Sequence, residues 1–284
     1  MFAVIATAFL LVFLLPEAAH AWGPATHLEL AREVMENPSL ISGPARALIE
    51  AFPYDFLYGS IAADIVVGKN LVEELKHCHN WKIGFRILKK AASPSQRAFA
   101  YGYLSHLAAD TVAHNHFIPE MMIRTFNTRM QRHVYWELRF DAMADKRVWQ
   151  LPKKIVKSIH DDNDRLLDST IEDTPLSFRT NKTIFSSIMS LHRFDQWHGM
   201  LNILSAASRW RLDREDKRRY AKRSLDAVTG LLSHGARAAC VKKDPTGKAG
   251  IASAQHTRAR LKRLRGNGDA WEDALEDALA EVRG

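Results

Sequence analysis

The chain has little cysteine and no pattern that calls for a β-sheet. Among its 284 residues there are two cysteines, Cys78 and Cys240. They allow at most one internal disulfide bond, so the chain is not a disulfide scaffold, and the sequence leaves open whether the two thiols pair. No stretch alternates apolar and polar residues for long enough to require a strand, and no internal repeat is present.

The chain also lacks an apolar run long enough to span a membrane. Residues 2–15 form an apolar run in which Thr7 is the one polar residue, whereas a transmembrane helix needs about 20 predominantly apolar residues. Pro16 and the small-residue sequence Ala19-His20-Ala21 follow the run. We therefore interpret residues 1–21 as a signal peptide that is cleaved after Ala21, and we expect a secreted protein, extracellular or periplasmic. No Lys or Arg precedes the run, although export signals normally carry positive charge there.

Apolar residues make up 46% of the chain and recur at helical spacing along most of it, which predicts an all-α fold. Ser93, Pro94 and Gln96 have the spacing of a capping box with proline at the first helical position, so a helix should begin there and carry residues 104–110. We expect one domain over residues 22–250 and a helical tail over residues 251–284. Further helices are expected over residues 122–147, 153–168, 181–192, 196–211, 214–239, 253–265 and 270–282.

Positive charge is in excess. Cleavage of the signal peptide removes one carboxylate, Glu17, and leaves 40 basic and 31 acidic residues. Such a surface attracts anionic lipid, nucleic acid or phosphate esters without distinguishing among them. The densest basic run, residues 258–265, is interpreted as the solvated face of a helix, and the tail turns acidic from Asp269 onward.

Histidines and carboxylates are spaced to bind metal. Seven of the thirteen histidines fall between His27 and His133. His106 and Asp110 are four residues apart, so they project from one face of their helix, and His133 and Glu137 repeat this spacing. One such pair on a helix is usually a surface hydrogen bond. Two pairs on neighbouring helices can hold metal ions between them.

The surrounding sequence strengthens this interpretation. His27, Asp64 and His79 lie upstream, and residues 106–116 (HLAADTVAHNH) are too rich in ligand side chains, and too apolar between them, for an ordinary solvated face. The pattern resembles the zinc-dependent phospholipase C family, which is related to the fungal single-strand-specific nucleases. The family is also related to the amino-terminal domain of glycosylphosphatidylinositol-specific phospholipase D. The resemblance covers residues 22–141.

The resemblance implies an all-α fold around a cluster of three zinc ions. In this family the first residue of the mature chain is a tryptophan whose amino nitrogen and carbonyl oxygen bind zinc, and here cleavage would expose Trp22 at that place. A terminal amine, with a pKa near 8, readily loses its proton to a zinc ion. The implied ligands are Trp22, His27, Asp64, His79, His106, Asp110, His116, His133 and Glu137.

Some positions of this ligand set have alternatives. His77 could replace His79, and His114 could replace His116. Most members of the family have proline at the position of His114, and the phospholipase D relatives use a histidine at that offset. The family often has proline at the position of Ala63. By the same resemblance, Asp64 binds metal and also orients or deprotonates the attacking water.

This chemistry suits phosphodiester hydrolysis. Two zinc ions about 3.5 to 4 Å apart can stabilise the attacking and leaving oxygens, and a zinc-bound water has a pKa lowered toward 7. The carboxylate at position 137 is glutamate, as it is in the phospholipases, whereas the nuclease relatives have aspartate there. The nucleases also tend to be disulfide-linked, so the low cysteine content favours a lipid substrate as well. We therefore expect a phospholipid substrate, with contact to a membrane surface through loops and basic residues. The alternatives are a single-strand-specific nuclease and a non-catalytic, zinc-stabilised surface-binding protein.

Overall fold

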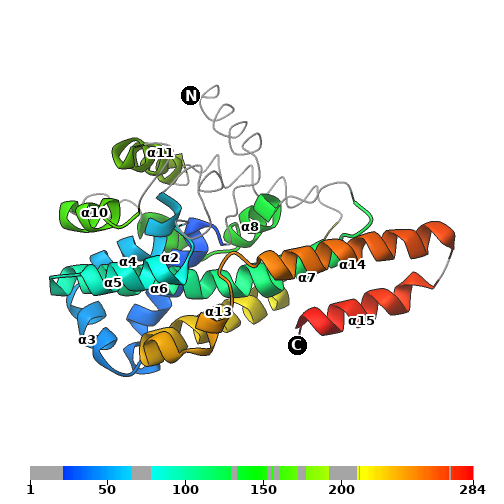
Figure 1. Cartoon of the computed structure of the whole chain (residues 1–284), viewed down its shortest axis with the longest axis horizontal. Coiled ribbons are helices and arrows are strands. Elements are labelled where there is room, and N and C mark those ends of the chain that lie inside the picture. Colours follow the sequence, from blue (N-terminus) through cyan, green and yellow to red (C-terminus); the bar gives the residue numbers. More distant parts are fainter. Residues whose placement is uncertain are drawn as a thin grey trace.

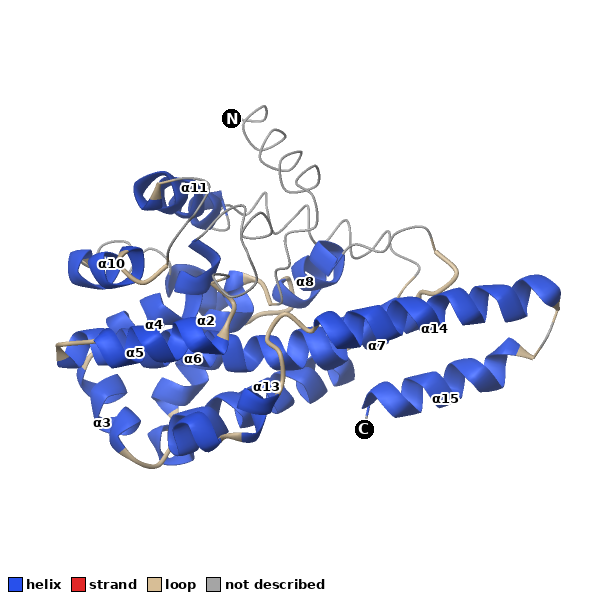
Figure 2. Ribbon diagram, in the orientation of Figure 1, coloured by secondary structure: helices blue, strands red, loops and turns tan. Residues whose placement is uncertain are grey.

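In the computed structural model, every regular element of the described residues is a helix (Figure 2). The all-α prediction is therefore confirmed. No helix among these residues has the length and apolarity that a membrane span requires. The predicted signal peptide lies outside the described residues. The structure describes residues 22–65, 78–128, 133–151, 155, 160–171, 177–191, 210, 212–268 and 270–283.

The helices are arranged around one central member, α6 (Figure 1). Short 3₁₀ turns and one π-helical turn, η5, join several of them. The α-helices are α2 (Pro24–Glu36), α3 (Pro44–Ala51), α4 (Pro53–Ala62), α5 (Trp81–Lys90), α6 (Pro94–Val112), α7 (Ile118–Arg124), α8 (His133–Asp141), α10 (Asp161–Asp168), α11 (Phe178–Leu191), α13 (Arg214–His234), α14 (Lys248–Asn267) and α15 (Trp271–Arg283). The shorter elements are η1 (Pro38–Leu40), η2 (Ala63–Ile65), η5 (Ala113–Phe117), η6 (Lys146–Gln150), η7 (Gly235–Arg237) and η8 (Ala239–Lys242).

Helix α6 is buried along most of its length and contacts α2, α4, α5 and α13. Its start has the predicted capping box. The Ser93 hydroxyl accepts a hydrogen bond from the Gln96 amide at 3.2 Å, and the Gln96 side chain accepts one from the Ser93 amide. This cap fixes where the helix begins, and therefore which side chains face its neighbours.

Two glycines allow α4 and α6 to touch backbone to backbone. A Cβ atom at Gly59 would lie 2.0 Å from the Phe99 carbonyl oxygen, and one at Gly102 would lie 2.1 Å from the Phe56 carbonyl oxygen. Any side chain at either position would push the helices apart. The crossing brings the end of α4, followed by Asp64 in η2, beside the second half of α6.

The C-terminal helices pack on the same body. Helix α13 lies along α6, α14 packs on α7 and η5, and α15 folds back beside α14 and α7 (Figure 1). The buried Arg258 of α14 donates hydrogen bonds to the carbonyl oxygens of Met122 at 2.6 Å and Thr125 at 3.2 Å. It thus caps the end of α7. Helix α14 runs through residue 250, where the predicted domain would end.

The predicted continuous helix over residues 122–147 is wrong. Helix α7 ends at Arg124, residues 125–127 form a turn, and α8 is a separate helix. The Thr125 hydroxyl donates back to the Met121 carbonyl at 2.7 Å, and Arg258 occupies carbonyl oxygens of this last turn. The interruption therefore depends on a residue more than 130 positions away in sequence.

Other helix boundaries differ by a few residues. Of the predicted helix over residues 153–168, α10 covers Asp161–Asp168, and most of the part before it lies outside the described residues. Helix α13 ends before Gly235, whose φ of +56° stops the helix short of residue 239. Helix α14 begins five residues before its predicted start and ends two after its predicted end. Helices α11 and α15 occupy residues 178–191 and 271–283, close to their predicted positions. Most of the predicted helix over residues 196–211 lies outside the described residues.

Candidate metal centre

Five of the predicted ligands meet in one buried cluster, which we call the metal cluster. Two sets of three have ligand atoms within 4.8 Å of one another: His27 with His106 and Asp110, and Asp64 with His79 and His106. Asp64, 8% exposed, is the most accessible of the five, and the others are at most 2% exposed. The metal cluster therefore comprises His27 of α2, Asp64 of η2, His79 just before α5, and His106 and Asp110 of α6.

The Asp110 carboxylate lies at the centre of the metal cluster. Its Oδ1 atom is 3.2 Å from His27 Nε2. Its Oδ2 atom is 3.2 Å from His106 Nε2 and 3.3 Å from His79 Nε2. The Asp64 Oδ1 atom is 3.3 Å from His79 Nε2. Four segments of the chain thus aim nitrogen and oxygen donors at a shared space.

The arrangement of these nitrogen and oxygen atoms is better suited to binding a metal ion than to forming hydrogen bonds with one another. The Nε2 atom of His27 and both carboxylate oxygens of Asp110 are buried and make no hydrogen bond, although their distances are short. The Nε2 atoms of His79 and His106 are 3.0 Å apart, and both also face Asp110. Buried polar atoms without a hydrogen bond are rare in folded proteins. Imidazole nitrogens and carboxylate oxygens are ordinary zinc ligands, so the set suits zinc.

Neighbouring groups orient the imidazoles. The Nδ1 atom of His106 donates to the Ser60 carbonyl oxygen at 3.0 Å, which leaves the lone pair on Nε2, facing the cluster. The Nδ1 atom of His79 lies 3.3 Å from the Cys78 sulfur, and the Tyr103 hydroxyl donates to the Cys78 carbonyl at 2.5 Å. Cys78 therefore supports His79 rather than belonging to the metal cluster. Cys78 and Cys240 are both free thiols.

The electrostatics favour the protonation states that bind zinc. Burial, with help from the neighbouring His106, lowers the pKa of His27. Burial alone would raise the pKa of Asp110, but His106, His27 and His79 together hold it well below its usual value. Neutral imidazole and ionised carboxylate are the forms that coordinate metal.

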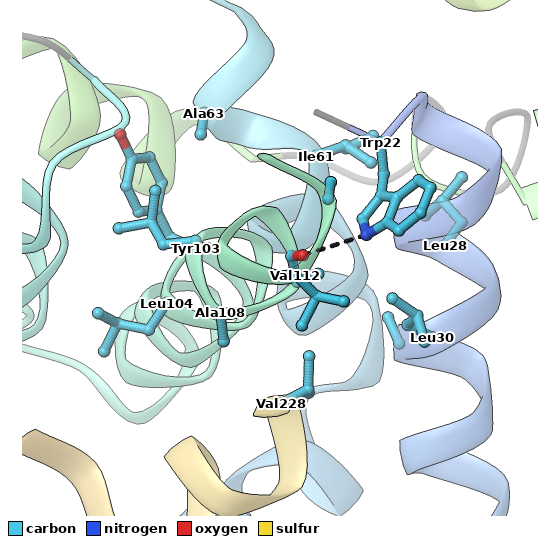
Figure 3. Close-up of a cluster of buried hydrophobic side chains, with 14 of the residues drawn as sticks. Trp22, Leu28, Leu30, Ile61, Ala63, Tyr103, Leu104, Ala108, Val112 and Val228 are labelled. Carbon is cyan, nitrogen blue, oxygen red and sulfur yellow. Dashed lines mark hydrogen bonds between the residues drawn. The ribbon is translucent and has the colours of Figure 1, made fainter. Parts of the chain in front are cut away.

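Trp22 is anchored beside the turn that carries Asp110. Its indole is fully buried, and its Nε1 donates to the Ala109 carbonyl at 3.1 Å (Figure 3) and lies 3.2 Å from the Ser224 hydroxyl. Its ring packs on Phe117 and Phe140, with centroids 4.8 and 4.0 Å away. The chain at residue 22 is therefore tied to α6 one residue before a central member of the metal cluster.

The start of α2 has a second anchor that the sequence analysis did not single out. The buried Asp141 carboxylate accepts hydrogen bonds from the backbone amides of Ala25 at 3.1 Å and Thr26 at 3.0 Å. Burial raises the pKa of Asp141 to about 6, against the opposing effects of Thr26 and Lys217. Asp141 thus fixes the first turn of α2 directly before His27.

Among the described residues, Glu137, His114 and His116 do not belong to the two donor sets of the metal cluster. Glu137 of α8 is 3% exposed, and His114 of η5 is fully buried. His77 and the side chain of His133 lie outside the described residues.

His116 is held by the C-terminal part of the chain. Its Nε2 atom is 2.7 Å from the Lys243 ammonium nitrogen, and its Nδ1 atom is 3.3 Å from the Val282 carbonyl oxygen. Burial, Arg223 and Lys243 lower the pKa of His116 to about 4. By contrast, Nδ1 of His114 lies 2.6 Å from the Pro245 carbonyl oxygen. No feature of the sequence signalled that Pro245 or Ser60 orients a histidine.

Comparison with known proteins bears on the same region. A family model described as zinc dependent phospholipase C matches residues 26–185, more than half of the chain. All five residues of the metal cluster fall inside the match. No curated protein and no solved structure matches the chain.

Proposed function

The chain belongs to the zinc-dependent phospholipase C family, and from this we propose that it is a secreted phospholipase C that uses three zinc ions. The observation that carries the proposal is the metal cluster, in which buried nitrogen and oxygen donors converge and the His27 Nε2 atom and both Asp110 oxygens make no hydrogen bond. A polar centre of this kind is costly to bury unless a ligand completes it.

The two donor sets would hold two of the ions. Asp110 offers one oxygen to the set with His27 and the other to the side of His79 and His106, so it can bridge. Zinc at these positions would supply a Lewis acid for the phosphate and lower the pKa of the attacking water. His106 is held in place by the Ser60 carbonyl, which keeps its Nε2 aimed at the centre.

Asp64 is the residue we propose as catalytic. It follows α4 in the short turn η2 and, of the five, has the most contact with solvent. Its carboxylate can therefore accept a proton from an attacking water while its Oδ1 stays 3.3 Å from His79. The other four residues are enclosed, which suits them to fixing geometry.

The third ion would be held by Glu137, by His133 and by an imidazole from η5. We propose His114 for this last ligand in place of His116, because both ring nitrogens of His116 face Lys243 and Val282. The main-chain amine and carbonyl of Trp22 would complete the centre after signal cleavage at Ala21. The buried indole supports this role, since it fixes residue 22 beside Ala109 and Asp110.

The test is an assay of the purified mature protein. Zinc per chain is measured, and hydrolysis is followed in parallel on choline, ethanolamine and inositol phospholipids and on single-stranded DNA. We expect about three zinc ions per chain and release of phosphorylated headgroup. The variant Asp64→Asn should lose hydrolysis while it keeps its helical content, and Asp226→Asn, at an exposed site of α13, should behave as wild type.

Three results would contradict parts of the proposal. Cleavage of single-stranded DNA with intact lipids would make the protein a nuclease. Bound zinc without turnover of any phosphodiester would make the centre structural, as in a surface-binding protein. Retained hydrolysis in Asp64→Asn would remove Asp64 from the mechanism.

A further inference from the structure

The loop between η8 and α14, residues 243–247, contacts α5 and η5, the elements that follow His79 and α6 in the chain. Three consecutive carbonyl oxygens of this 243–247 loop accept hydrogen bonds from side chains of α5 and η5. The bonds are Trp81 Nε1 to the Lys243 carbonyl at 2.8 Å, Asn115 Nδ2 to the Asp244 carbonyl at 2.8 Å, and His114 Nδ1 to the Pro245 carbonyl at 2.6 Å.

Hydrogen bonds within the 243–247 loop fix its conformation. The Asp244 carboxylate accepts hydrogen bonds from the Thr246 amide at 3.0 Å, the Thr246 hydroxyl at 2.5 Å and the Lys248 amide at 3.3 Å. The Gly247 amide donates to the Asp244 carbonyl at 3.1 Å. A turn closed in this way holds the Pro245 carbonyl in one direction.

Gly247 brings the loop into direct contact with His114. Its φ is +60°, and a Cβ atom added there would lie 2.4 Å from the Cβ of His114 and 2.6 Å from its carbonyl oxygen. Only glycine satisfies both the backbone conformation and the approach. The loop therefore fixes the backbone and the ring of His114 together.

The consequence is a defined tautomer. A carbonyl oxygen only accepts, so Nδ1 of His114 carries the proton and the lone pair is on Nε2. Histidines that bind metal commonly donate their other nitrogen to a carbonyl in this way. His114 follows Asp110 by four residues, so the two side chains lie on the same side of the helix one turn apart. His116, two residues further on, faces Lys243 of the same loop.

We propose that the 243–247 loop is a positioning element that makes His114, and not His116, a ligand of the metal centre. The Pro245 carbonyl sets the ring of His114, and Lys243 holds His116 away from the centre. This inference rests on the zinc centre of the proposed function but not on its lipid substrate.

The deciding experiment compares Gly247→Ala with Gly268→Ala. Gly268 also has a left-handed backbone, with φ of +78°, but an added Cβ would meet no atom within 4 Å. Zinc affinity is measured by competition with a chromophoric chelator, and ligand geometry by the absorption spectrum of the cobalt(II)-substituted protein. Gly247→Ala should weaken the binding of one ion by about 10- to 100-fold, as loss of an outer-shell partner does, and change the cobalt spectrum. Gly268→Ala should bind as wild type.

Variants of the two histidines identify the ligand. His114→Ala should lose one zinc ion, and adding Gly247→Ala to it should cause no further loss, because both changes act on the same ligand. His116→Ala should retain wild-type zinc content. Equal affinities in Gly247→Ala and Gly268→Ala, or loss of zinc in His116→Ala, would overturn the proposal.

A second pair of variants covers the case in which Gly247→Ala fails to fold. Asp244→Ala removes the acceptor that braces the loop, whereas Asp244→Asn keeps an oxygen there. We expect weaker zinc binding in Asp244→Ala and recovery in Asp244→Asn, and wild-type affinity in both would again overturn the proposal. A wild-type protein without zinc would defeat the proposed function and this inference together. A zinc-loaded protein that leaves lipids intact would defeat only the function.

Discussion

Two of the sites at which this chain buries a carboxylate have different surroundings. In the metal cluster, the Asp110 oxygens lie 3.2 to 3.3 Å from three imidazoles and make no hydrogen bond among the described residues. The other site, the Glu120 network, surrounds the fully buried Glu120 of α7 with donors from α7 itself and from two other helices, α13 and α15. Its donors are Arg124 at 2.9 Å, Arg219 at 3.0 and 3.1 Å, Arg283 at 3.0 and 3.1 Å, and the Tyr220 hydroxyl.

The difference shows which site needs something from outside the chain. Burial would raise the pKa of Glu120, but Arg283, Tyr220 and the other arginines hold it below its usual value. That charge is compensated by the protein itself, which gives the Glu120 network a structural role in joining α7, α13 and α15. The metal cluster has no such cation among the described residues that face Asp110. Its carboxylates are therefore poised for a cation that the protein must acquire.

Among the substitutions that test this difference between the two sites, we expect the largest effect on hydrolysis from one at Asp110. Asp110→Asn replaces one bridging oxygen with an amide nitrogen that cannot bind zinc, so we predict a loss of hydrolysis of at least about 100-fold, beyond what outer-shell changes cause. Zinc per chain should fall in the same variant. Removing zinc from wild type with a chelator should abolish hydrolysis and lower the thermal midpoint, because zinc stabilises only the folded state. A variant that kept full zinc content would contradict the bridging role.

The next effect is at Glu120. Removing one partner from a buried ionic network costs about 3 to 5 kcal/mol, and the lower part of that range applies here because the arginines are 24 to 40% exposed. We predict this loss of unfolding free energy in Glu120→Ala, measured by urea denaturation. Zinc per folded chain and specific activity should be unchanged. Loss of zinc without loss of stability would instead assign Glu120 to the metal centre, and the two sites would no longer differ in role.

The sequence predicted the metal cluster far better than the Glu120 network, for a physical reason. His106 and Asp110 belong to one helix, and helical spacing alone puts them on one face. Glu120 and Arg283 are 163 residues apart, and no local spacing relates them. The same limit explains the choice between His114 and His116. In our proposal it depends on the Pro245 carbonyl and on Lys243, backbone and side-chain partners that lie more than 120 positions downstream.

Helix types and starts were also predictable where the signal was local. The capping box at Ser93 involves residues three apart, and it was confirmed. The break after Arg124 was missed because Arg258 of α14 caps that end. The close crossing of α4 and α6 was likewise not anticipated, since Gly59 and Gly102 reveal their role only when the two helices are paired.

Neighbouring groups offset the burial of the Asp141 carboxylate only in part. Its titration should therefore affect how the free energy of unfolding depends on pH. Its pKa is raised from 3.8 to about 6 by burial. The folded state therefore holds a proton that the unfolded chain releases, and stability falls as pH rises through about 4 to 6. The shift corresponds to about 3 kcal/mol. Asp141→Asn cannot titrate, so its unfolding free energy should rise relative to wild type by that amount between pH 4 and pH 7.

The comparison of Asp141 is made on metal-free protein, because zinc affinity itself depends on pH. Titration of the metal cluster then contributes equally to both proteins and cancels in the difference. Parallel stability curves for wild type and Asp141→Asn would show that the four hydrogen-bonding or charged groups around Asp141 offset its burial fully.

The smallest effect belongs to a carboxylate that is not buried. Glu50 pairs with Arg46 at 3.1 Å on α3, and both side chains are 48% exposed. Exposed pairs of this spacing contribute about 0.3 to 0.5 kcal/mol and are screened by salt. Glu50→Gln should therefore lower the free energy of unfolding by no more than that at low salt, and by nothing measurable at about 1 M salt, where the Debye length is about 3 Å. Zinc content and hydrolysis should not change. If Glu50→Gln lost as much unfolding free energy as Glu120→Ala, the degree of burial would not explain the difference between these carboxylates. The burial of Asp110 would then be no argument that it needs a metal ion.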